Sequence, residues 1–454
     1  MNLWTSSEIA EATGGTASGS FAAAGVAFDS REVGPGDLFV ALAGEVTDGH
    51  RFLPQAFGRG AAGAIVSEAC DGPHVRVPDG FAALEALARA SRARTGARLI
   101  GVTGSVGKTS AKEALHAALE RSDPGRAHRS VKSYNNHTGV PLSLARMPRD
   151  SLFGVLEMGM NHAGELAALT RIVRPHVAIV TAIAPAHLEF FADEAAIADA
   201  KAEIFQGLEP GGVAIVPGDS PHRDRLVAAA RACGAGVVTF GLKEGADVHA
   251  REAVRLPTGG TFVTARLGGR ELSFTVAQPG EHWVSNALAV LAAVDAVGAD
   301  LGQAGLALAE MGGLPGRGAR VGVRAGDGEA LIIDESYNAN PASMRASLAV
   351  LGHEPGRKIA VLGEIRELGE RSAELHADLA EPILAARVGA ALLVGEAMAP
   401  LARALEDRID LVHAPDAAAA LDRLRPMLAP GDAVLVKGSN GVRLSRLVAG
   451  LGAG

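Results

Sequence analysis

Short apolar runs, separated by helical or turn segments, recur along the whole chain. The first part carries them at residues 25–28, 38–42 and 63–66. From about residue 97 to 310 longer runs alternate with helical stretches, at residues 99–102, 153–156, 177–183 and 213–216. A second such series lies at residues 330–333, 358–362, 390–394 and 433–436. Short buried runs that alternate with helices predict mainly parallel sheets with helices on both faces.

These series divide the chain into three predicted α/β domains. A Pro-Gly-Arg-Gly turn at residues 315–318 separates the last two series and is typical of a linker. We therefore expect a small α/β domain over residues 1–95, a central domain with a mainly parallel sheet over 96–312, and a C-terminal domain over 313–454.

Composition narrows the possible partners. Of the 454 residues 48% are hydrophobic, enough for several cores, and the formal net charge is −8 without long runs of one sign. This charge does not favour nucleic acid or an anionic membrane as the main partner. Two cysteines, Cys70 and Cys233, fit a reducing compartment. We see neither a signal peptide nor an apolar run of the ~18 residues that a membrane span needs, so we expect a cytoplasmic protein that does not insert into membranes.

The stretch GVTGSVGKTS at residues 101–110 has the pattern of a phosphate-binding loop, because an apolar run precedes it and a helical segment follows. In such loops glycines let backbone N–H groups face a β-phosphate. Lys108 would then meet the β- and γ-oxygens, and Thr109 would hold Mg²⁺. The first glycine of the usual pattern is missing, and Gly104 and Gly107 shape the loop instead. The pattern indicates ATP or GTP; the alternative is an ordinary strand-to-helix turn with an exposed lysine.

Polar residues follow several of the predicted strands, where ligands of open α/β sheets bind. Glu157 ends the run FGVLE, and a carboxylate there suits a Mg²⁺ that bridges phosphates. The alternative interpretation is that Glu157 is structural and caps a helix or forms a salt bridge. His187 and Lys201 follow the next strand, and from the pattern alone both are interpreted as structural residues. A lysine would bind a metal only as a carbamate, formed with CO₂, and the spacing does not show this.

The strands of the C-terminal series also end in polar residues. Residues 334–341, DESYNANP, combine carboxylates and amides after the strand ALIID, with an asparagine-rich turn as the alternative interpretation. From their strand-end positions, Asn338, Asn340 and Lys437 are candidates for presenting a second substrate.

Taken together, the motifs occur in the order found in a known enzyme family. They are TGSVGKTS, SYNNHTGVP, LEMGMNHAGELA, PAHLEFF, AKAEIF, DESYNANPASM, VLGEIRELG and VKGSNGVRL. Over nearly its whole length the chain resembles the Mur ligases, ATP-dependent amino-acid and peptide ligases of bacterial cell-wall synthesis. Residues 28–50 resemble the UDP-sugar-binding domain of the family, and the last domain would be Rossmann-like. Within the family, YNANP points to the addition of D-alanyl-D-alanine to UDP-MurNAc-tripeptide.

The resemblance implies roles for matched residues. The triphosphate of ATP would be held by Gly104, Ser105, Val106, Gly107, Lys108, Thr109 and Ser110. Of two Mg²⁺ ions, Thr109 and Glu157 would bind the first, while His187 and a carbamylated Lys201 would bind the second. Lys108, Lys201 and His187 would thus be the catalytic residues.

Further matched positions concern the two nucleotides. ATP would also be contacted by Asn136, Asn286, Arg317 and Glu335. Glu335 stands where the family usually has aspartate, and Trp283 stands where it usually has asparagine, so Asn286 would act alone there. Ser30 and Arg31 would lie near the uridine nucleotide.

The implied activity is a ligation through an acyl phosphate, in which ATP activates the tripeptide carboxylate and D-alanyl-D-alanine supplies the amine. We expect the enzyme to act as a monomer. One alternative is a related ligase that adds a single amino acid or glutamate. A regulator that only binds ATP is another, but it leaves the N-terminal and C-terminal domains unexplained.

Overall fold

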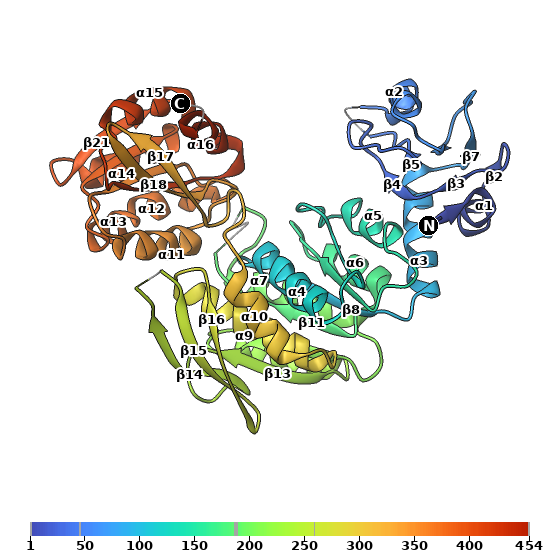
Figure 1. Cartoon of the computed structure of the whole chain (residues 1–454), viewed down its shortest axis with the longest axis horizontal. Helices are drawn as coiled ribbons and strands as arrows, with labels where there is room; N and C mark the ends of the chain where they lie inside the picture. The colour runs from blue at the N-terminus through green and yellow to red at the C-terminus, as the bar shows by residue number, and fades with distance from the viewer. Residues whose placement is uncertain (1, 45–46, 186–188, 258, 453–454) are drawn as a thin grey trace.

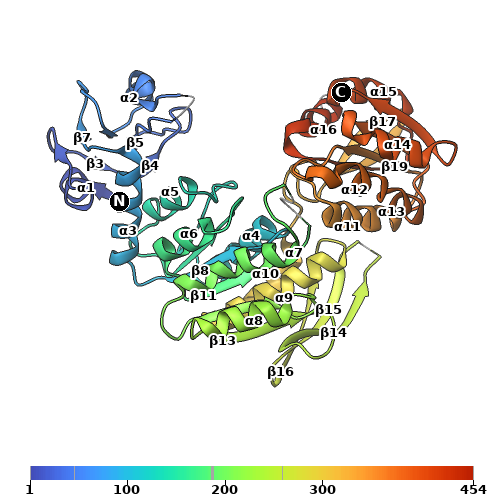
Figure 2. The same cartoon turned by 180° about the vertical axis from the view of Figure 1, so that it is seen from behind.

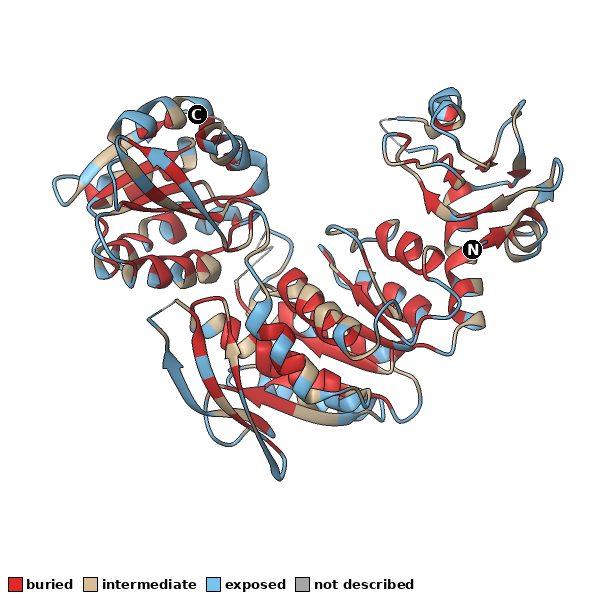
Figure 3. Cartoon of the chain, in the orientation of Figure 1, coloured by how far each residue is buried: buried red, intermediate tan, exposed pale blue. Residues whose placement is uncertain are grey.

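The computed structural model describes residues 2–44, 47–185, 189–257 and 259–452, which form three α/β units. The N-terminal unit (blue) and the C-terminal unit (orange to red) stand apart on the same side of the central unit (Figures 1 and 2). Buried residues concentrate in the sheets and on the helix faces that cover them (Figure 3). The predicted α/β fold is therefore confirmed. Among the described residues, no helix has both the length and the apolar character to cross a membrane.

The N-terminal unit is built on a small sheet of strand order β2-β7-β6-β5-β4, parallel except at β2. Its strands are β1 (Trp4–Thr5), β2 (Thr16–Ala17), β3 (Ala22–Ala23), β4 (Gly25–Ala27), β5 (Asp37–Val40), β6 (Gly63–Val66) and β7 (His74–Arg76). Its helices are α1 (Ser6–Thr13), α2 (Leu53–Gly58) and α3 (Gly80–Arg94). Thr5 and Glu8 form a capping box that starts α1. The three predicted apolar runs correspond to β4, β5 and β6.

The central unit contains a sheet of strand order β16-β15-β14-β13-β12-β11-β8-β10-β9. Its strands are β8 (Arg98–Thr103), β9 (Ala127–Arg129), β10 (Phe153–Glu157), β11 (Val177–Val180), β12 (Val213–Pro217), β13 (Gly236–Gly241), β14 (Val248–Arg255), β15 (Thr261–Leu267) and β16 (Arg270–Val276). Its helices are α4 (Lys108–Ser122), α5 (Gly139–Ala145), α6 (Glu165–Val173), α7 (Glu194–Ala202), α8 (Arg223–Ala232), α9 (Glu281–Ala296) and α10 (Leu301–Glu310). The strands from β9 to β14 pair in parallel.

Two apolar cores cover the faces of this sheet. Ile100 of β8 packs into the core formed with α4, α9 and α10, and its neighbour Leu99 packs into the core formed with α5 to α8. Alternation of side chains along a strand places them on opposite faces. The order of the strands puts β8 between β10 and β11, so their carboxyl ends meet at one edge.

The central sheet differs from the sequence prediction at several strands. The run predicted as a strand over 177–183 is a strand only to Val180. The backbone of the next two residues forms hydrogen bonds with Thr103 at the end of β8 and with Ser105 in the loop that follows it. Strands β9 and β13 to β16 are not predicted; β14 pairs in parallel with β13, and β15 and β16 extend the sheet from β14 in antiparallel pairing. Most residues of β14 are exposed or half-buried, so its sequence lacks the apolar run of a buried strand.

The C-terminal unit has a sheet of strand order β17-β18-β22-β19-β20-β21, parallel except at β17. Its strands are β17 (Ala319–Ala325), β18 (Gly328–Glu335), β19 (Lys358–Gly363), β20 (Ala390–Val394), β21 (Asp410–Ala414) and β22 (Ala433–Lys437). Its helices are α11 (Pro341–Gly352), α12 (Ser372–Ala377), α13 (Ala380–Ala385), α14 (Ala399–Leu405), α15 (Ala417–Leu424) and α16 (Leu444–Gly452). All four predicted apolar runs lie in its strands.

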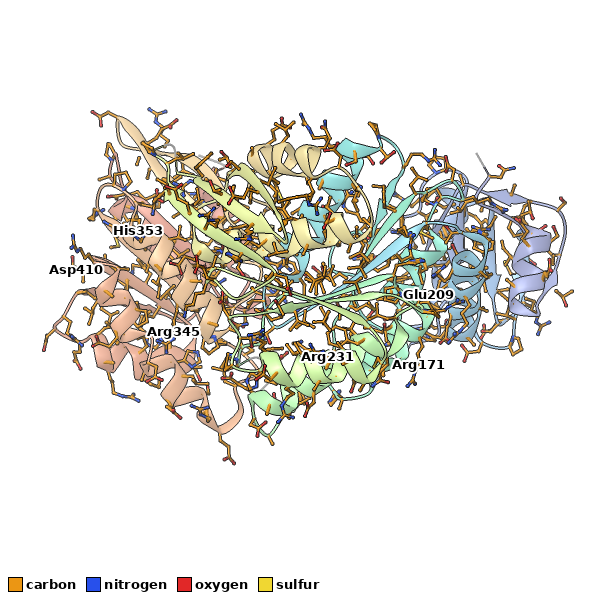
Figure 4. All side chains as sticks on the ribbon, turned by 90° about the horizontal axis from the view of Figure 1, so that it is seen from below. Arg171, Glu209, Arg231, Arg345, His353 and Asp410 are labelled. Atoms are coloured by element: carbon orange, nitrogen blue, oxygen red, sulfur yellow. The ribbon has the colours of Figure 1, made fainter. Side chains whose placement is uncertain are left out.

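The connections between the units are short. Glu209, labelled in Figure 4, accepts a hydrogen bond from Arg92 at the end of α3 (2.8 Å). The same carboxylate lies 2.7 Å from the Arg174 guanidinium, so these contacts attach α3 to the central unit. The predicted domain boundary at 95/96 falls between α3 and β8, and the one at 312/313 falls between α10 and β17. Both boundaries remain predictions.

Candidate active site

The phosphate-binding motif forms a loop between β8, which ends at Thr103, and α4, which begins at Lys108. The loop leads into the N-terminus of α4, where free backbone N–H groups favour an anion. Ser105 holds the loop against the residues after β11: its N–H donates to the Ala182 carbonyl (2.8 Å), and its hydroxyl accepts from the Ala184 N–H (3.1 Å). The loop therefore has the place and the support that phosphate binding requires.

Two glycines are required by the shape of this loop. Gly104 has a φ of +147°, and a Cβ added to it would lie 2.0 Å from Thr181 Oγ1. Gly107 has a φ of +83°, and its added Cβ would lie 2.7 Å from Asn286 Oδ1. The Thr181 hydroxyl also donates a hydrogen bond to the Val106 carbonyl (2.5 Å). Thr181, which packs against Gly104, therefore helps to hold the loop in shape. Glycine is the residue that adopts these backbone angles without steric cost.

Gly107→Ala is expected to weaken nucleotide binding by about tenfold or more, because left-handed backbone costs a non-glycine residue ~1–2 kcal/mol and Asn286 must also move. Gly125→Ala is the matched control, since Gly125 has a similar φ of +76° but open space around the added Cβ. Titration of ADP by calorimetry measures both. Equal affinities of the two variants would show that the Gly107 contact does not shape the nucleotide site.

Lys108 lies at the first turn of α4 with its ammonium turned back onto the loop. Its Nζ donates to the Gly104 carbonyl at 2.6 Å. Burial lowers the pKa of Lys108, the Arg317 guanidinium lowers it further, and the Glu157 carboxylate opposes this by raising it. A polyphosphate beside this ammonium would favour its charged form, so the group is suited to bind an anion.

Thr109 and Glu157 form a compact pair of oxygen ligands next to the loop. The Thr109 hydroxyl donates to Glu157 Oε2 at 2.8 Å, and both side chains are buried. Asn135 Nδ2 donates to the other carboxylate oxygen at 2.8 Å. Hydroxyl and carboxylate oxygens are the ligands that Mg²⁺ prefers, and one ion between them would also reach a nucleotide phosphate. The residues present therefore fit a Mg²⁺ ion.

Lys201 lies on α7 and is almost completely buried. Burial lowers its pKa well below the ordinary value, and the nearby Lys108 ammonium lowers it further. Both effects shift Lys201 toward the neutral amine, which is the form that reacts with CO₂. His187, predicted as the companion ligand, lies outside the described residues.

Arg317 connects the central unit to the residues that follow the linker. Its guanidinium lies 4.0 Å above the Tyr337 ring, and its Nη2 donates to Ser133 Oγ at 3.3 Å. The contact with Ser133 joins the linker to the central unit. Asn286, on α9, is buried and faces Gly107, which places its amide beside the phosphate loop.

The predicted residues of the C-terminal unit face the same place. Lys437, at the end of β22, is buried and donates to Glu335 Oε2 (3.3 Å) and to the Asn338 carbonyl (3.0 Å). Asn340 caps α11: its Oδ1 accepts from the Ser343 N–H at 2.8 Å. His282 lies near this group, and burial lowers its pKa although Glu335 opposes the shift.

These elements enclose one cavity of about 510 Å³ between the central and C-terminal units. Its lining includes most of the predicted site residues, namely Ser105, Val106, Gly107, Lys108, Thr109, Ser110, Glu157, Asn286, Arg317, Glu335, Asn338, Asn340 and Lys437. Basic side chains on both sides and a pair of metal-binding oxygens suit a nucleotide with its metal and a second anionic group.

Other predicted residues are placed elsewhere. Asn136 is exposed and does not line the cavity; its Oδ1 accepts from the Gly139 N–H at the start of α5 (2.9 Å). Its neighbour Asn135 takes the place beside Glu157. Ser30 and Arg31 lie in the N-terminal unit: the buried Ser30 hydroxyl donates to Gln55 (2.8 Å), and the exposed Arg31 pairs with Asp29 (2.6 Å). A uridine nucleotide bound near Ser30 and Arg31 would therefore lie at a site separate from the cavity.

Sequence reasoning missed several residues of the site. Ser133, Asn135, Thr181 and His282 line the cavity, and Lys112 lies 3.9 Å from Glu157 without lining it. Thr181 was placed inside a strand, and Asn135 was passed over for the asparagine next to it. Lys112 carries a usable signal, because a lysine one helical turn after the loop lysine faces the same side of the helix.

Comparison with protein families matches the chain to Mur ligases in each of its units. The model described as "Mur ligase family, catalytic domain" matches residues 23–92. The model "Mur ligase middle domain" matches residues 102–294, and "Mur ligase, glutamate ligase domain" matches residues 316–440.

Individual relatives are similar over nearly the full length. The UDP-N-acetylmuramoyl-tripeptide–D-alanyl-D-alanine ligase of Escherichia coli (strain K12) is 34% identical, with 94% of this chain and 93% of the relative covered. The ligase of the same name from Bacillus subtilis (strain 168) is 33% identical, with 93% and 92% covered. A crystal structure of MurF from Acinetobacter baumannii superposes with a TM-score of 0.86 at 32% identity, covering 99% of each chain. MurF ligase from Thermotoga maritima in complex with ADP gives a TM-score of 0.78 at 27% identity, covering 94% and 97%.

Proposed function

The chain belongs to the Mur ligase family, and from this premise we propose that it joins D-alanyl-D-alanine to UDP-N-acetylmuramoyl-tripeptide while ATP is converted to ADP and phosphate. The product is the UDP-MurNAc-pentapeptide precursor of peptidoglycan. The observation that carries the proposal is the single cavity in which the phosphate loop and the Thr109–Glu157 pair face Lys437 and Asn338 of the C-terminal unit. Activation and amine delivery thus share one space.

The first step forms an acyl phosphate. The terminal carboxylate of the tripeptide attacks the γ-phosphorus of ATP, the bond to the bridging oxygen breaks, and ADP leaves. Lys108 and the N–H groups at the start of α4 hold the phosphates, which is mostly positioning and electrostatic stabilisation. Thr109 and Glu157 would hold Mg²⁺, which would neutralise part of the phosphate charge.

The second step forms the amide. The free amine of D-alanyl-D-alanine attacks the activated carbonyl, a tetrahedral intermediate forms, and phosphate leaves as the amine loses its proton. Asn338, Asn340 and Lys437 lie on the side of the cavity from which the amine would come. Closure of the C-terminal unit over the site would exclude water, which would otherwise hydrolyse the acyl phosphate.

Finer features of the reaction belong to the same proposal. A second Mg²⁺ would be bound by His187 and by a carbamate on Lys201, whose buried amine has a strongly lowered pKa. Asn286, Arg317 and Glu335 would contact the rest of ATP, while Ser30 and Arg31 would lie near the uridine nucleotide. The enzyme would work as a monomer in the cytoplasm.

Phosphate release assays with UDP-MurNAc-tripeptide test the substrate assignment. We expect ATP-dependent phosphate release with D-alanyl-D-alanine and little with D-alanine, glutamate or diaminopimelate, because the amine pocket must recognise both residues of the dipeptide. Mass spectrometry of the product should show the pentapeptide. Equal or faster release with a single amino acid would instead identify a different ligase of the family. ATP binding without any amine-dependent product would identify a regulator.

A further inference from the structure

Lys112 is a buried cation that the proposed reaction leaves without a role. It lies on α4 one turn after Lys108 and is completely shielded from solvent. Its Nζ donates to the Lys132 carbonyl at 2.7 Å, and it lies 3.0 Å from Glu113 Oε1 and 3.9 Å from Glu157 Oε2. Burial of a charge is costly unless partners satisfy it, so these contacts account for its position.

The carbonyl that Lys112 binds belongs to residues 130–136, here called the junction loop. This loop is attached to β10 at its start: Ser130 N–H donates to the Val155 carbonyl (3.0 Å), and the Ser130 hydroxyl accepts from the Glu157 N–H (3.1 Å). Lys132 has a left-handed backbone with a φ of +52°, which is uncommon outside glycine. Such a conformation persists only where surrounding contacts hold it.

The same loop holds the Glu157 side chain from its other side. Asn135 Nδ2 donates to Oε1 (2.8 Å), while Thr109 and Lys112 lie beside Oε2. Both oxygens of the carboxylate therefore have partners that determine its orientation.

The outer side of the junction loop contacts the N-terminal unit. Glu32 accepts a hydrogen bond from the Tyr134 hydroxyl (2.8 Å) and forms an ion pair with the Lys132 ammonium. Glu32 directly follows Ser30 and Arg31, the residues expected near the uridine nucleotide. A continuous set of contacts thus runs from Glu32 through Lys132 and Lys112 to Glu157.

We propose that Lys112 and Glu32 are positioning residues, which hold the Glu157 carboxylate in its metal-binding orientation through the junction loop. The inference rests on the proposed function in taking Glu157 as a Mg²⁺ ligand. Residues that orient a metal ligand change metal affinity by about 10- to 100-fold when they are replaced. The proposal extends this dependence to a residue of the N-terminal unit, so an alteration near the acceptor site would change Mg²⁺ binding at the ATP site.

The first experiment compares Lys112→Met with Lys112→Arg in the full-length protein. Calorimetric titration of ADP is done at a series of Mg²⁺ concentrations and with EDTA. For Lys112→Met we expect the Mg²⁺ concentration at half-maximal enhancement to rise by about tenfold or more, with ADP binding in EDTA within about twofold of wild type. Lys112→Arg keeps the positive charge and should recover part of the loss.

The second experiment compares Glu32→Gln with Glu8→Gln. Each replaces one carboxylate of an ion pair between the N-terminal and central units, since Glu8 pairs with Arg149 (2.5 Å) away from the junction loop. Glu32→Gln should raise the Mg²⁺ requirement by about threefold or more, and Glu8→Gln should leave it unchanged. Melting temperatures of both variants show whether a loss of stability contributes.

The outcomes separate this inference from the proposed function. If a folded Lys112→Met variant needs no more Mg²⁺ than wild type, Lys112 has no positioning role. If Lys112→Met does not fold, the Glu32 comparison decides, and equal Mg²⁺ requirements for Glu32→Gln and Glu8→Gln overturn the proposal. ADP binding by wild type that does not depend on Mg²⁺ would contradict the proposed function itself.

Discussion

Lys108→Ala is expected to lower ATP-dependent phosphate release by at least ~100-fold. The Lys108 ammonium, which belongs to the phosphate loop, would stabilise the negative charge of the phosphoryl group that is transferred. ADP affinity should fall as well, since the ground state also carries negative charge near this group. Phosphate release in the presence of UDP-MurNAc-tripeptide and D-alanyl-D-alanine measures the effect.

Lys243→Ala is a suitable control, because Lys243 is an exposed lysine of the same unit outside the cavity. Near-normal ligation by Lys108→Ala would overturn the assignment of the phosphate loop. The pH dependence gives a second check. Because burial lowers the pKa of Lys108, the free enzyme loses this charge at a lower pH than an exposed lysine would, so ATP affinity should weaken earlier on the alkaline side.

Lys201→Ala is expected to be inactive and to regain part of its activity with added acetate or formate. In the proposed site the Lys201 amine reacts with CO₂ to give a carbamate and a proton, and the carbamate oxygens bind the second Mg²⁺. Burial and Lys108 lower the pKa of Lys201, so the reactive neutral amine persists to lower pH than in an exposed lysine. A small carboxylate in the vacated space would supply equivalent oxygens.

Lys201→Met controls for stability in this test. Its apolar side chain has a similar length and removes a buried polar amine, so the variant should fold with an unchanged or higher melting temperature yet remain inactive. Acetate should not change wild-type activity. Full activity of Lys201→Ala without added carboxylate would remove Lys201 from the metal site.

Much of the fold follows from local sequence. Runs such as 63–66 and 390–394 are apolar because both faces of their strands are buried, and the structure places strands at both. β14 was missed for the converse reason. It joins the parallel strands to the antiparallel pair β15–β16, and most of its residues are exposed or half-buried, so neither an apolar run nor strict alternation marks it.

The residues of the candidate site also fall into two groups, those that local sequence identifies and those that only the fold brings together. Lys108 and Thr109 share one motif with the glycines, and Glu157 ends a buried strand, so short-range pattern was enough to choose them. Thr181 joins the site, and Lys112 contacts the junction loop behind it, only because the fold brings β8, β11 and the junction loop together. Such convergence depends on strand order, which local pattern does not contain.

The sequence by itself determined the three α/β units, the phosphate loop and the family, because each depends on residue types at short, regular spacing. Only the tertiary structure decided which of two adjacent asparagines lines the cavity. Asn135 donates to Glu157 while Asn136 accepts from the Gly139 N–H at the start of α5, although both belong to the same motif. The backbone path of the junction loop sets the direction of each side chain, and contacts with Lys112, β10 and Glu32 hold that path.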